Sequence, residues 1–227
     1  MSEASRTKHR TTARFVLESL EGLTLFLVVV TAWPVLGRWL RDWGSSETER
    51  TRTWAGDELV ANAVEVFTRG VSVEAEPVSV WPWLVQFGLG RAGFYSYEFL
   101  ERITGIPVRN VEAILPEHQA LEVGDEIKLH PNAPGIRVGK IEAGRHVCFG
   151  VAPGAEGAEI PDPRRSWSIY VEPQAAGGSR LVVRSCIEAL RRPTFAKRVG
   201  LALEVPVDFV MEQRMLRTIK RLAESKT

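Results

Sequence analysis

The 227-residue sequence has few of the residues that metal sites and disulfide frameworks require. Its two cysteines, Cys148 and Cys186, form no CxxC pair, and its four histidines show no HExxH-type spacing. We therefore predict no metal site, and we expect both cysteines to be small buried apolar residues. A disulfide between them would require an oxidising compartment, and the sequence leaves their redox state open.

The sequence also lacks an excess of charge of either sign. Lysine and arginine together number 29, aspartate and glutamate 28, and the formal net charge at pH 7 is +1. The body of the chain contains no basic cluster with interleaved aromatic residues, which a nucleic-acid-binding surface would need. We therefore predict no nucleic-acid partner.

One uncharged apolar run, GLTLFLVVVTAWPVLG, occupies residues 22–37 near the amino terminus. A helix that spans a bilayer needs about 20 apolar residues. The run reaches that length if Leu20, Trp39 and Leu40 are included and Arg38 extends its side chain to the interface. Tryptophans gather toward one end of the run, as in an aromatic belt: Trp33, Trp39 and Trp43.

This run predicts a single membrane anchor over residues 19–43, preceded by a basic polar tail over residues 1–18. The alternative is a buried or interfacial helix, in which case the protein could be cytoplasmic. A cleaved signal peptide fits less well, because no A-x-A site follows the run. Glu18 and Glu21 mark where a spanning segment must stop. Basic residues flank the run on both sides, so the positive-inside rule assigns no orientation.

Residues 44–58 (GSSETERTRTWAGDE) are small or charged and have no apolar period, which predicts a linker before a folded domain over residues 59–227. In that domain, residues 64–75 alternate apolar and polar positions, and the phase switches at residues 69–70. Such a switch at a glycine predicts a bulged strand. A helix is expected from Pro77, although Pro82 requires a later start or a kink.

The segment QFGLGRAGFY then places Gly88, Gly90 and Gly93 at the GxGxxG spacing of a dinucleotide-binding turn. Such a turn needs a strand before the glycines and a helix that opens directly on them. Here a helix precedes the glycines, and the next helix is expected only from Ser96. We therefore predict a sharp turn between two helices and no nucleotide or other cofactor.

The remainder of the domain alternates apolar and polar residues in short segments, beginning with DEIKLHP, and the short spacings predict hairpins in an antiparallel sheet. One segment places Trp167, Ile169 and Val171 on a common face. Residues 206–225 predict an amphipathic helix. Its apolar face is formed by Val207, Met211, Met215, Ile219 and Leu222.

The predicted order is a strand, two short helices, about five antiparallel strands and a long closing helix. It predicts an α+β fold in which a curved antiparallel sheet wraps around the C-terminal helix and leaves an apolar cavity between them. With VWPWLVQFGLGRAGFYSYEFLER, GDEIKLHP and FVMEQRMLRTIKRLAE, this order resembles the START-related helix-grip superfamily (SRPBCC) over residues 59–224. It is most similar to bacterial proteins labelled polyketide cyclase/dehydratase or lipid-transport-like. The resemblance implies a cavity and no particular reaction, because this superfamily has no universal catalytic motif.

The candidate ligand-binding residues are polar, aromatic or flexible side chains expected near that cavity: Trp83, Gln86, Arg91, Tyr95, Tyr97, His130, Arg184, Met211 and Met215. Arg91 could hold a ligand carboxylate or phosphate at the entrance, or it could pair with Glu98 or Glu101. His130 could act as an acid or base if it faces inward. No Ser-His-Asp, Cys-His or paired-carboxylate arrangement stands out.

Two functions are therefore open at the level of sequence. The first is binding of a hydrophobic small molecule or lipid by a membrane-tethered protein. The second is a cyclase/dehydratase-type enzyme that acts on a polyketide-like or aromatic substrate. The lack of a recognisable catalytic set favours binding, whereas a histidine or glutamate within hydrogen-bond reach of a bound carbonyl would favour catalysis.

Overall fold

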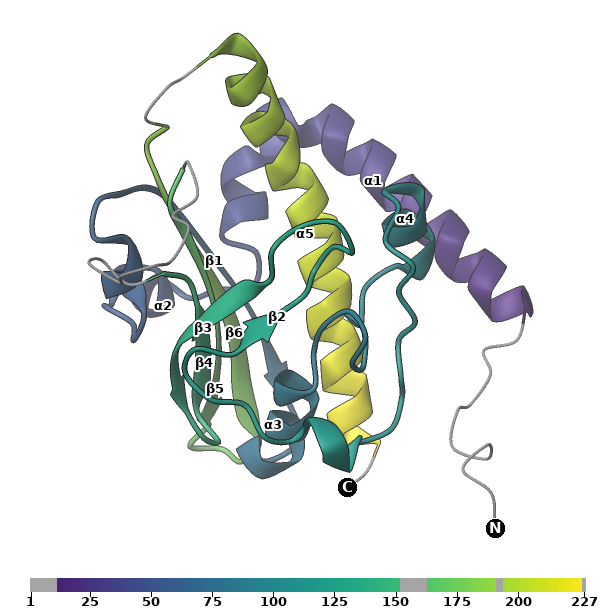
Figure 1. Cartoon of the computed structure of the whole chain (residues 1–227), viewed down its shortest axis with the longest axis vertical. Coiled ribbons are helices and arrows are strands. Elements are labelled where there is room, and N and C mark those ends of the chain that lie inside the picture. Colours follow the sequence, from purple (N-terminus) through teal and green to yellow (C-terminus); the bar gives the residue numbers. More distant parts are fainter. Residues whose placement is uncertain (1–11, 152–162, 191–193, 226–227) are drawn as a thin grey trace.

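The computed structural model describes residues 12–151, 163–190 and 194–225, and it contains one six-stranded antiparallel sheet in the order β1-β6-β5-β4-β3-β2 (Figure 1). The strands are β1 (Ala63–Val73), β2 (Glu126–Ile127), β3 (Ile136–Glu142), β4 (His146–Phe149), β5 (Arg165–Pro173) and β6 (Ser179–Glu188). The α-helices are α1 (Thr12–Arg41), α2 (Glu47–Thr51), α3 (Pro77–Val85), α4 (Glu98–Ile103) and α5 (Phe195–Glu224). Short 3₁₀ turns lie at Asp57–Val60 and Pro116–His118.

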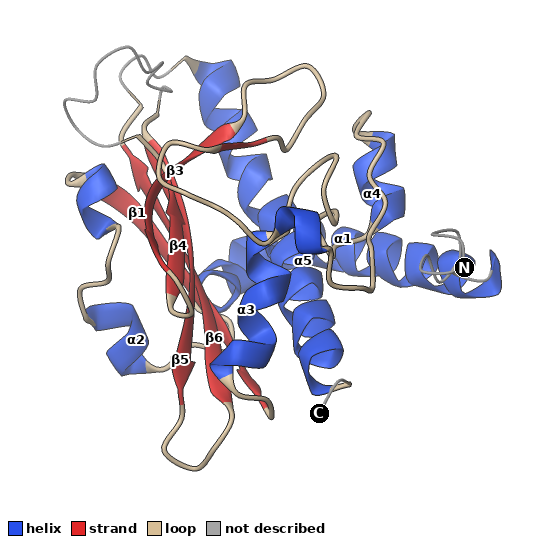
Figure 2. Ribbon diagram, turned by 60° about the horizontal axis from the view of Figure 1, so that its bottom comes forward, coloured by secondary structure: helices blue, strands red, loops and turns tan. Residues whose placement is uncertain are grey.

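The long helix α5 runs across one face of the curved sheet, with the N-terminal helix α1 beside it (Figures 1 and 2). Met215, Leu216 and Ile219 of α5 pack into the main core with the sheet, whereas Phe209 and Val210 pack against α1. The predicted α+β helix-grip fold with an N-terminal hydrophobic helix is therefore confirmed.

Strands β5 and β6 have the alternation that the sequence predicts. Trp167, Ile169 and Val171 of β5 belong to the main core under α5, whereas Tyr170 belongs to a separate cluster with Val182 of β6. Side chains alternate between the two faces of a strand, so residues of one phase meet α5 and residues of the other phase lie on the outer face.

Strand β1 does not have the bulge predicted at residues 69–70. Arg69 faces Val183 and Gly70 faces Val182 in continuous register, and the register shift lies between Ala63 and Glu65. The apparent phase switch arose because Val64 and Val66 are apolar yet belong to the outer phase, where they are 64% and 37% exposed.

Helix α5 begins at Phe195, well before the predicted start at Pro206. Pro206 lies inside the helix, where it removes one backbone donor without ending the helix. The predicted helix start was therefore wrong. Proline is favoured in a first turn, and the sequence alone did not distinguish that position from an interior one.

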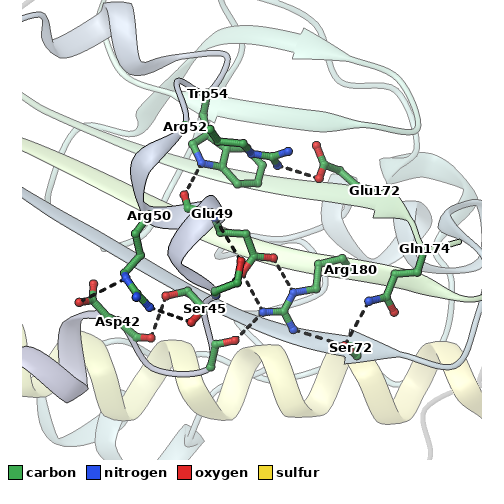
Figure 3. A network of polar contacts seen from close by, with 12 residues as sticks. Asp42, Ser45, Glu49, Arg50, Arg52, Trp54, Ser72, Glu172, Gln174 and Arg180 are labelled. Atoms are coloured by element: carbon green, nitrogen blue, oxygen red, sulfur yellow. Dashed lines mark hydrogen bonds and ion pairs between the residues drawn. The ribbon is translucent and has the colours of Figure 1, made fainter. Parts of the chain in front are cut away.

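Residues 44–58, predicted as a linker, are attached to the outer face of the sheet (Figure 3). Arg180 of β6 donates to both carboxylate oxygens of Glu49 in α2, from Nε at 2.7 Å and from Nη2 at 3.0 Å. Burial alone would raise the pKa of Glu49, but the hydrogen bonds from Arg180 and Ser46 lower it. Trp54 is 4% exposed and packs on the Tyr170 ring at 4.3 Å. The charged composition concealed the contacts with Arg180 and Tyr170, which are distant in the sequence.

Both cysteines are buried, as the sequence predicts, and they are free and lie on the outer side of the sheet. The Cys148 thiol donates to the carbonyl of Ala55 at 3.2 Å. Burial raises the pKa of both thiols, that of Cys186 to about 11. Neither group is therefore activated as a nucleophile near neutral pH.

Helix α1 contains Phe15–Trp33, the one stretch within the described part of the chain that is long and apolar enough to cross a membrane by length and composition. The helix begins at Thr12, so residues 12–18 of the predicted tail are helical. Val29 and Leu40 are buried against α5. One side of α1 is thus part of the fold.

Candidate functional site

A cavity of about 1060 Å³ lies between the inner face of the sheet and the helices α5, α4 and α1. Its walls include Phe149 and Trp167 from the sheet and Met211 and Met215 from α5. Leu100 adds a wall from α4. Volumes of this order, with mainly apolar walls and a few polar groups, are typical of small-molecule sites.

Aromatic rings stabilise the sheet side of the cavity. The rings of Phe149 and Trp167 stack at 5.4 Å, because β4 and β5 pair these two residues directly. Phe87, which follows α3, packs at 5.3 Å from Trp167 and 5.2 Å from Phe94. This row gives the cavity a rigid apolar wall, since aromatic pairs add to the stability that burial provides.

A buried ion pair joins the cavity wall to α1. Glu212 of α5 lines the cavity, and its carboxylate accepts hydrogen bonds from Trp167 Nε1 at 2.7 Å and from Arg69 Nη1. Arg69 is 2% exposed and also donates from Nε to the carbonyl of Leu40, near the end of α1, at 2.9 Å. Both Glu212 oxygens therefore have partners, and the group supports the wall.

A second carboxyl group in the lining is less strongly paired. Glu101 of α4 accepts one hydrogen bond, from Ser96 Oγ at 2.7 Å, and both residues line the cavity. Burial raises the pKa of Glu101, and the hydrogen bond from Ser96 only partly offsets this effect. The group therefore keeps its proton to a higher pH than an exposed glutamate does.

Of the nine predicted ligand residues, Met211 and Met215 line the cavity. Trp83, Gln86 and Tyr95 are buried in the core beneath it. Gln86 Nε2 donates to Tyr95 Oη at 2.7 Å, and its Oε1 accepts from the Leu115 amide at 2.9 Å. Its Nε2 also donates to the carbonyl of Ala113, and its Oε1 also accepts from Gln119. Gln86 thus joins the glycine turn to the segment that follows α4, and its amide has no hydrogen-bonding role left for a ligand.

Arg91 lies away from the predicted cavity mouth. Its Nη2 donates to the carbonyl of Val85, the last residue of α3, at 2.8 Å and to that of His118 at 3.1 Å. Desolvation lowers the pKa of Arg91. The turn folds back on itself, with the Gly88 amide donating to the Gly93 carbonyl at 3.0 Å, so Arg91 points to neighbouring backbone rather than to an entrance. The prediction of a turn between two helices is confirmed.

Arg184, His130 and Tyr97 were also predicted to bind a ligand, and they too lie outside the cavity lining. Arg184 is on the outer face of the sheet, where it donates to Asp57 and Thr68 at 2.8 Å each. His130 lies beyond the end of β2, in a turn where its Nδ1 accepts from the Asn132 amide at 3.1 Å.

Tyr97, the remaining predicted residue, packs against α1 instead of the cavity. Its hydroxyl donates to Glu21 at 3.1 Å, and the Arg214 guanidinium lies 5.0 Å from its ring centre. Burial and the nearby carboxylate of Glu21 raise the pKa of Tyr97 to about 12.

The sequence did not single out several residues that the cavity uses, namely Ser96, Glu101, Phe149, Glu212, Leu23 and Phe26. Trp167 could have been identified from the alternation of β5, which places its side chain on the same face as those of Ile169 and Val171. Leu23 and Phe26 were obscured because the apolar run of α1 was assigned to a bilayer. Within the described residues, no group of three or more His, Cys, Asp or Glu side chains could hold a metal ion.

Comparison with known proteins supports no assignment to a family. No family model and no curated protein matches the sequence. The chain is similar to several solved structures. A protein from Nitrosomonas europaea is 12% identical with a TM-score of 0.41, over 71% of this chain and 96% of that one. Ara h 8.0201 is 13% identical with a TM-score of 0.36, over 71% of this chain and 98% of that one. CalU16 from Micromonospora echinospora is 14% identical with a TM-score of 0.32, over 70% of this chain and 83% of that one.

Proposed function

We propose that the protein binds a hydrophobic small molecule or lipid in the cavity between the sheet and α5, and that α1 holds it at a membrane. The observation that carries the proposal is the cavity of about 1060 Å³, whose walls are largely aromatic, aliphatic and methionine side chains. Methionine suits such a wall because its unbranched thioether adapts to ligands of different shape. The order of elements around the cavity supports a place for this chain in the SRPBCC superfamily.

The polar groups of the lining indicate which ligands fit. Glu212 is fully paired with Arg69 and Trp167, so it offers little to a ligand. Glu101 and Ser96 form a polar point on the α4 side of a largely apolar wall, and further polar groups of the lining, among them Arg137, Arg165 and Asp208, lie on the sheet and on α5. A ligand with an extended apolar body and one hydroxyl or carbonyl group would match this distribution, because that group would avoid burial without a hydrogen bond.

Native mass spectrometry of the gently purified full-length protein tests the proposal. We expect a mass for the protein plus an apolar molecule, and organic extraction should recover the same molecule. A protein that carries only its own mass, and that takes up no lipid when mixed with a total lipid extract, would contradict the proposal.

The second candidate is a cyclase/dehydratase-type enzyme, and the buried Glu101 carboxyl favours it. A protonated carboxyl in an apolar cavity can act as a general acid, a role that contributes about 10²–10⁴-fold to rate. The extracted molecule, returned to the protein, would distinguish the candidates. Recovery of a molecule with the same mass and the same chromatographic retention indicates binding alone. Conversion to a product of new mass or new retention, slowed about 100-fold or more in Glu101→Gln, would establish catalysis instead.

A further inference from the structure

Helix α1 has an unusual distribution of polarity, because Glu18 faces the protein and a row of apolar side chains faces outward. On the inner face, Glu18 pairs with Arg214 of α5 at 2.9 Å. Gly22 lies so close to Tyr97 that a Cβ at this position would be 2.9 Å from the Tyr97 ring. Near its end, α1 is held by the bond from Arg69 to Leu40. The inner face is therefore fixed along most of the helix.

The outer face of α1 is uncharged from residue 17 to residue 35. Over these residues, the large apolar side chains that are more than half exposed recur at helical spacing: Leu17 (67% exposed), Leu20 (58%), Leu27 (55%), Val28 (53%) and Val35 (86%). The hydroxyl of Thr31 on the same face bonds back to the carbonyls of Leu27 and Val28. At a rise of 1.5 Å per residue, this face is roughly 27 Å long. Apolar faces of this extent mark interaction sites.

Glu21 lies at the margin of the outer face, and its charge is partly compensated. It accepts the hydrogen bond of Tyr97 and lies 3.7 Å from Arg214. Arg38, in the last turn of α1, ends the apolar face with an exposed positive charge. Before the helix and in its first turn, the sequence of residues 1–14 contains four lysine or arginine residues and one glutamate. Positive charge thus flanks the apolar face on both sides, which complements an anionic bilayer surface.

The side of α1 between its two faces borders the cavity. Leu23 and Phe26 line the cavity together with Leu100 and Ile103 of α4, and Ile103 is 65% exposed. The edge of the cavity formed by α1 and α4 is therefore apolar and adjoins the exposed face of α1.

We propose that α1 lies in the plane of an anionic membrane surface rather than spanning the bilayer, and that the cavity opens toward the acyl chains along α1 and α4. A spanning helix is surrounded by lipid on all sides. Here the inner face is covered by α5 and Tyr97, so spanning would break the Glu18 and Arg214 pair or draw it into the hydrocarbon. In the planar orientation the pair stays with the domain and the apolar face is buried. A lipid could then enter the cavity without crossing water, a step that rests on the proposed function.

Leu20→Glu/Leu27→Glu in the full-length protein tests this placement. With vesicles of phosphatidylcholine and phosphatidylglycerol, we expect the wild type to co-float and to be released by alkaline carbonate. The double variant should lose vesicle affinity at least about tenfold, because two carboxylates replace buried apolar area. It should also stop withdrawing a phosphatidylcholine with a fluorescent acyl chain from donor vesicles. Val78→Glu/Val123→Glu, which alters apolar residues of similar exposure outside α1, should behave as wild type.

A water-soluble probe, anilinonaphthalene sulfonate, separates this inference from the proposed function. The α1 double variant should still take up the probe from solution, whereas a variant with a filled cavity should float with vesicles but bind no probe. Wild type that does not float, or that resists carbonate, would overturn the placement of α1. A Leu20→Glu/Leu27→Glu variant that floats as well as wild type would overturn it too. A dimer that the two glutamates dissociate, with no vesicle binding by wild type, would assign the face to a second copy instead. Flotation without any probe uptake by wild type would overturn only the cavity.

Discussion

Met215→Trp is expected to abolish uptake of a hydrophobic fluorescent probe, with an affinity loss of about 100-fold or more, while the domain stays folded. Met215 is 3% exposed on α5 and faces the cavity opposite the aromatic wall of the sheet. An indole ring at this position would extend into the space that the ligand needs. Because there is a cavity beside the residue, the larger side chain should cost only about 1–3 kcal/mol of stability.

Probe titration and circular dichroism measure this effect together, and Met215→Leu is the matched control. Leucine nearly preserves the volume of methionine, so this variant should bind the probe with almost wild-type affinity and lose less than about 1.5 kcal/mol of stability. Unchanged probe affinity in Met215→Trp, with a normal spectrum, would mean that α5 seals a solid core. The cavity would then not be the binding site.

Arg69→Met should lower the free energy of unfolding by about 3–5 kcal/mol, the cost of removing one partner from a buried ion pair. Arg69 is 2% exposed, and its guanidinium bonds to Glu212 of α5 and to the carbonyl of Leu40 in α1. The substitution keeps the length and apolar stem of the side chain but leaves the Glu212 carboxylate buried with Trp167 as its remaining partner. Urea denaturation at constant m-value measures the change.

Two further variants define the origin of that loss. Lys140→Met removes an exposed pair with Glu58, whose side chains are 45% and 57% exposed, and should change stability by less than about 1 kcal/mol. Arg69→Met/Glu212→Leu should recover much of the loss, because no uncompensated buried charge is left. A change below about 1 kcal/mol in Arg69→Met alone would show that the pair does not join the sheet to α5 and α1.

The sequence allows prediction of those elements whose two faces meet different environments. Strands β5 and β6 alternate because one phase meets α5 and the other lies on the outer side, so Trp167 and Ile169 were assigned to a common face. The turn after α3 was predictable because local chemistry, with glycines at residues 88, 90 and 93, determines it.

Long-range contacts account for the parts that were not predictable. Arg91 and Gln86 are of residue types that often bind ligands. Here Arg91 instead donates to the carbonyl of His118, and Gln86 accepts from the amide of Leu115, and both of these backbone groups are distant in the sequence. Similarly, the charged segment around Glu49 has no apolar period because its attachment to β6 depends on Arg180. Glu101 could not be distinguished from exposed glutamates, since only the packing of α4 over the cavity buries it.

Crystals of the full-length protein grown with a brominated fatty acid would test the central claim most directly, because the anomalous signal of bromine locates the ligand without bias. The proposed function predicts a bromine peak between Met215 of α5 and Trp167 of β5. Bromine found only on the outer face of the sheet, or an empty cavity at saturating ligand, would contradict it.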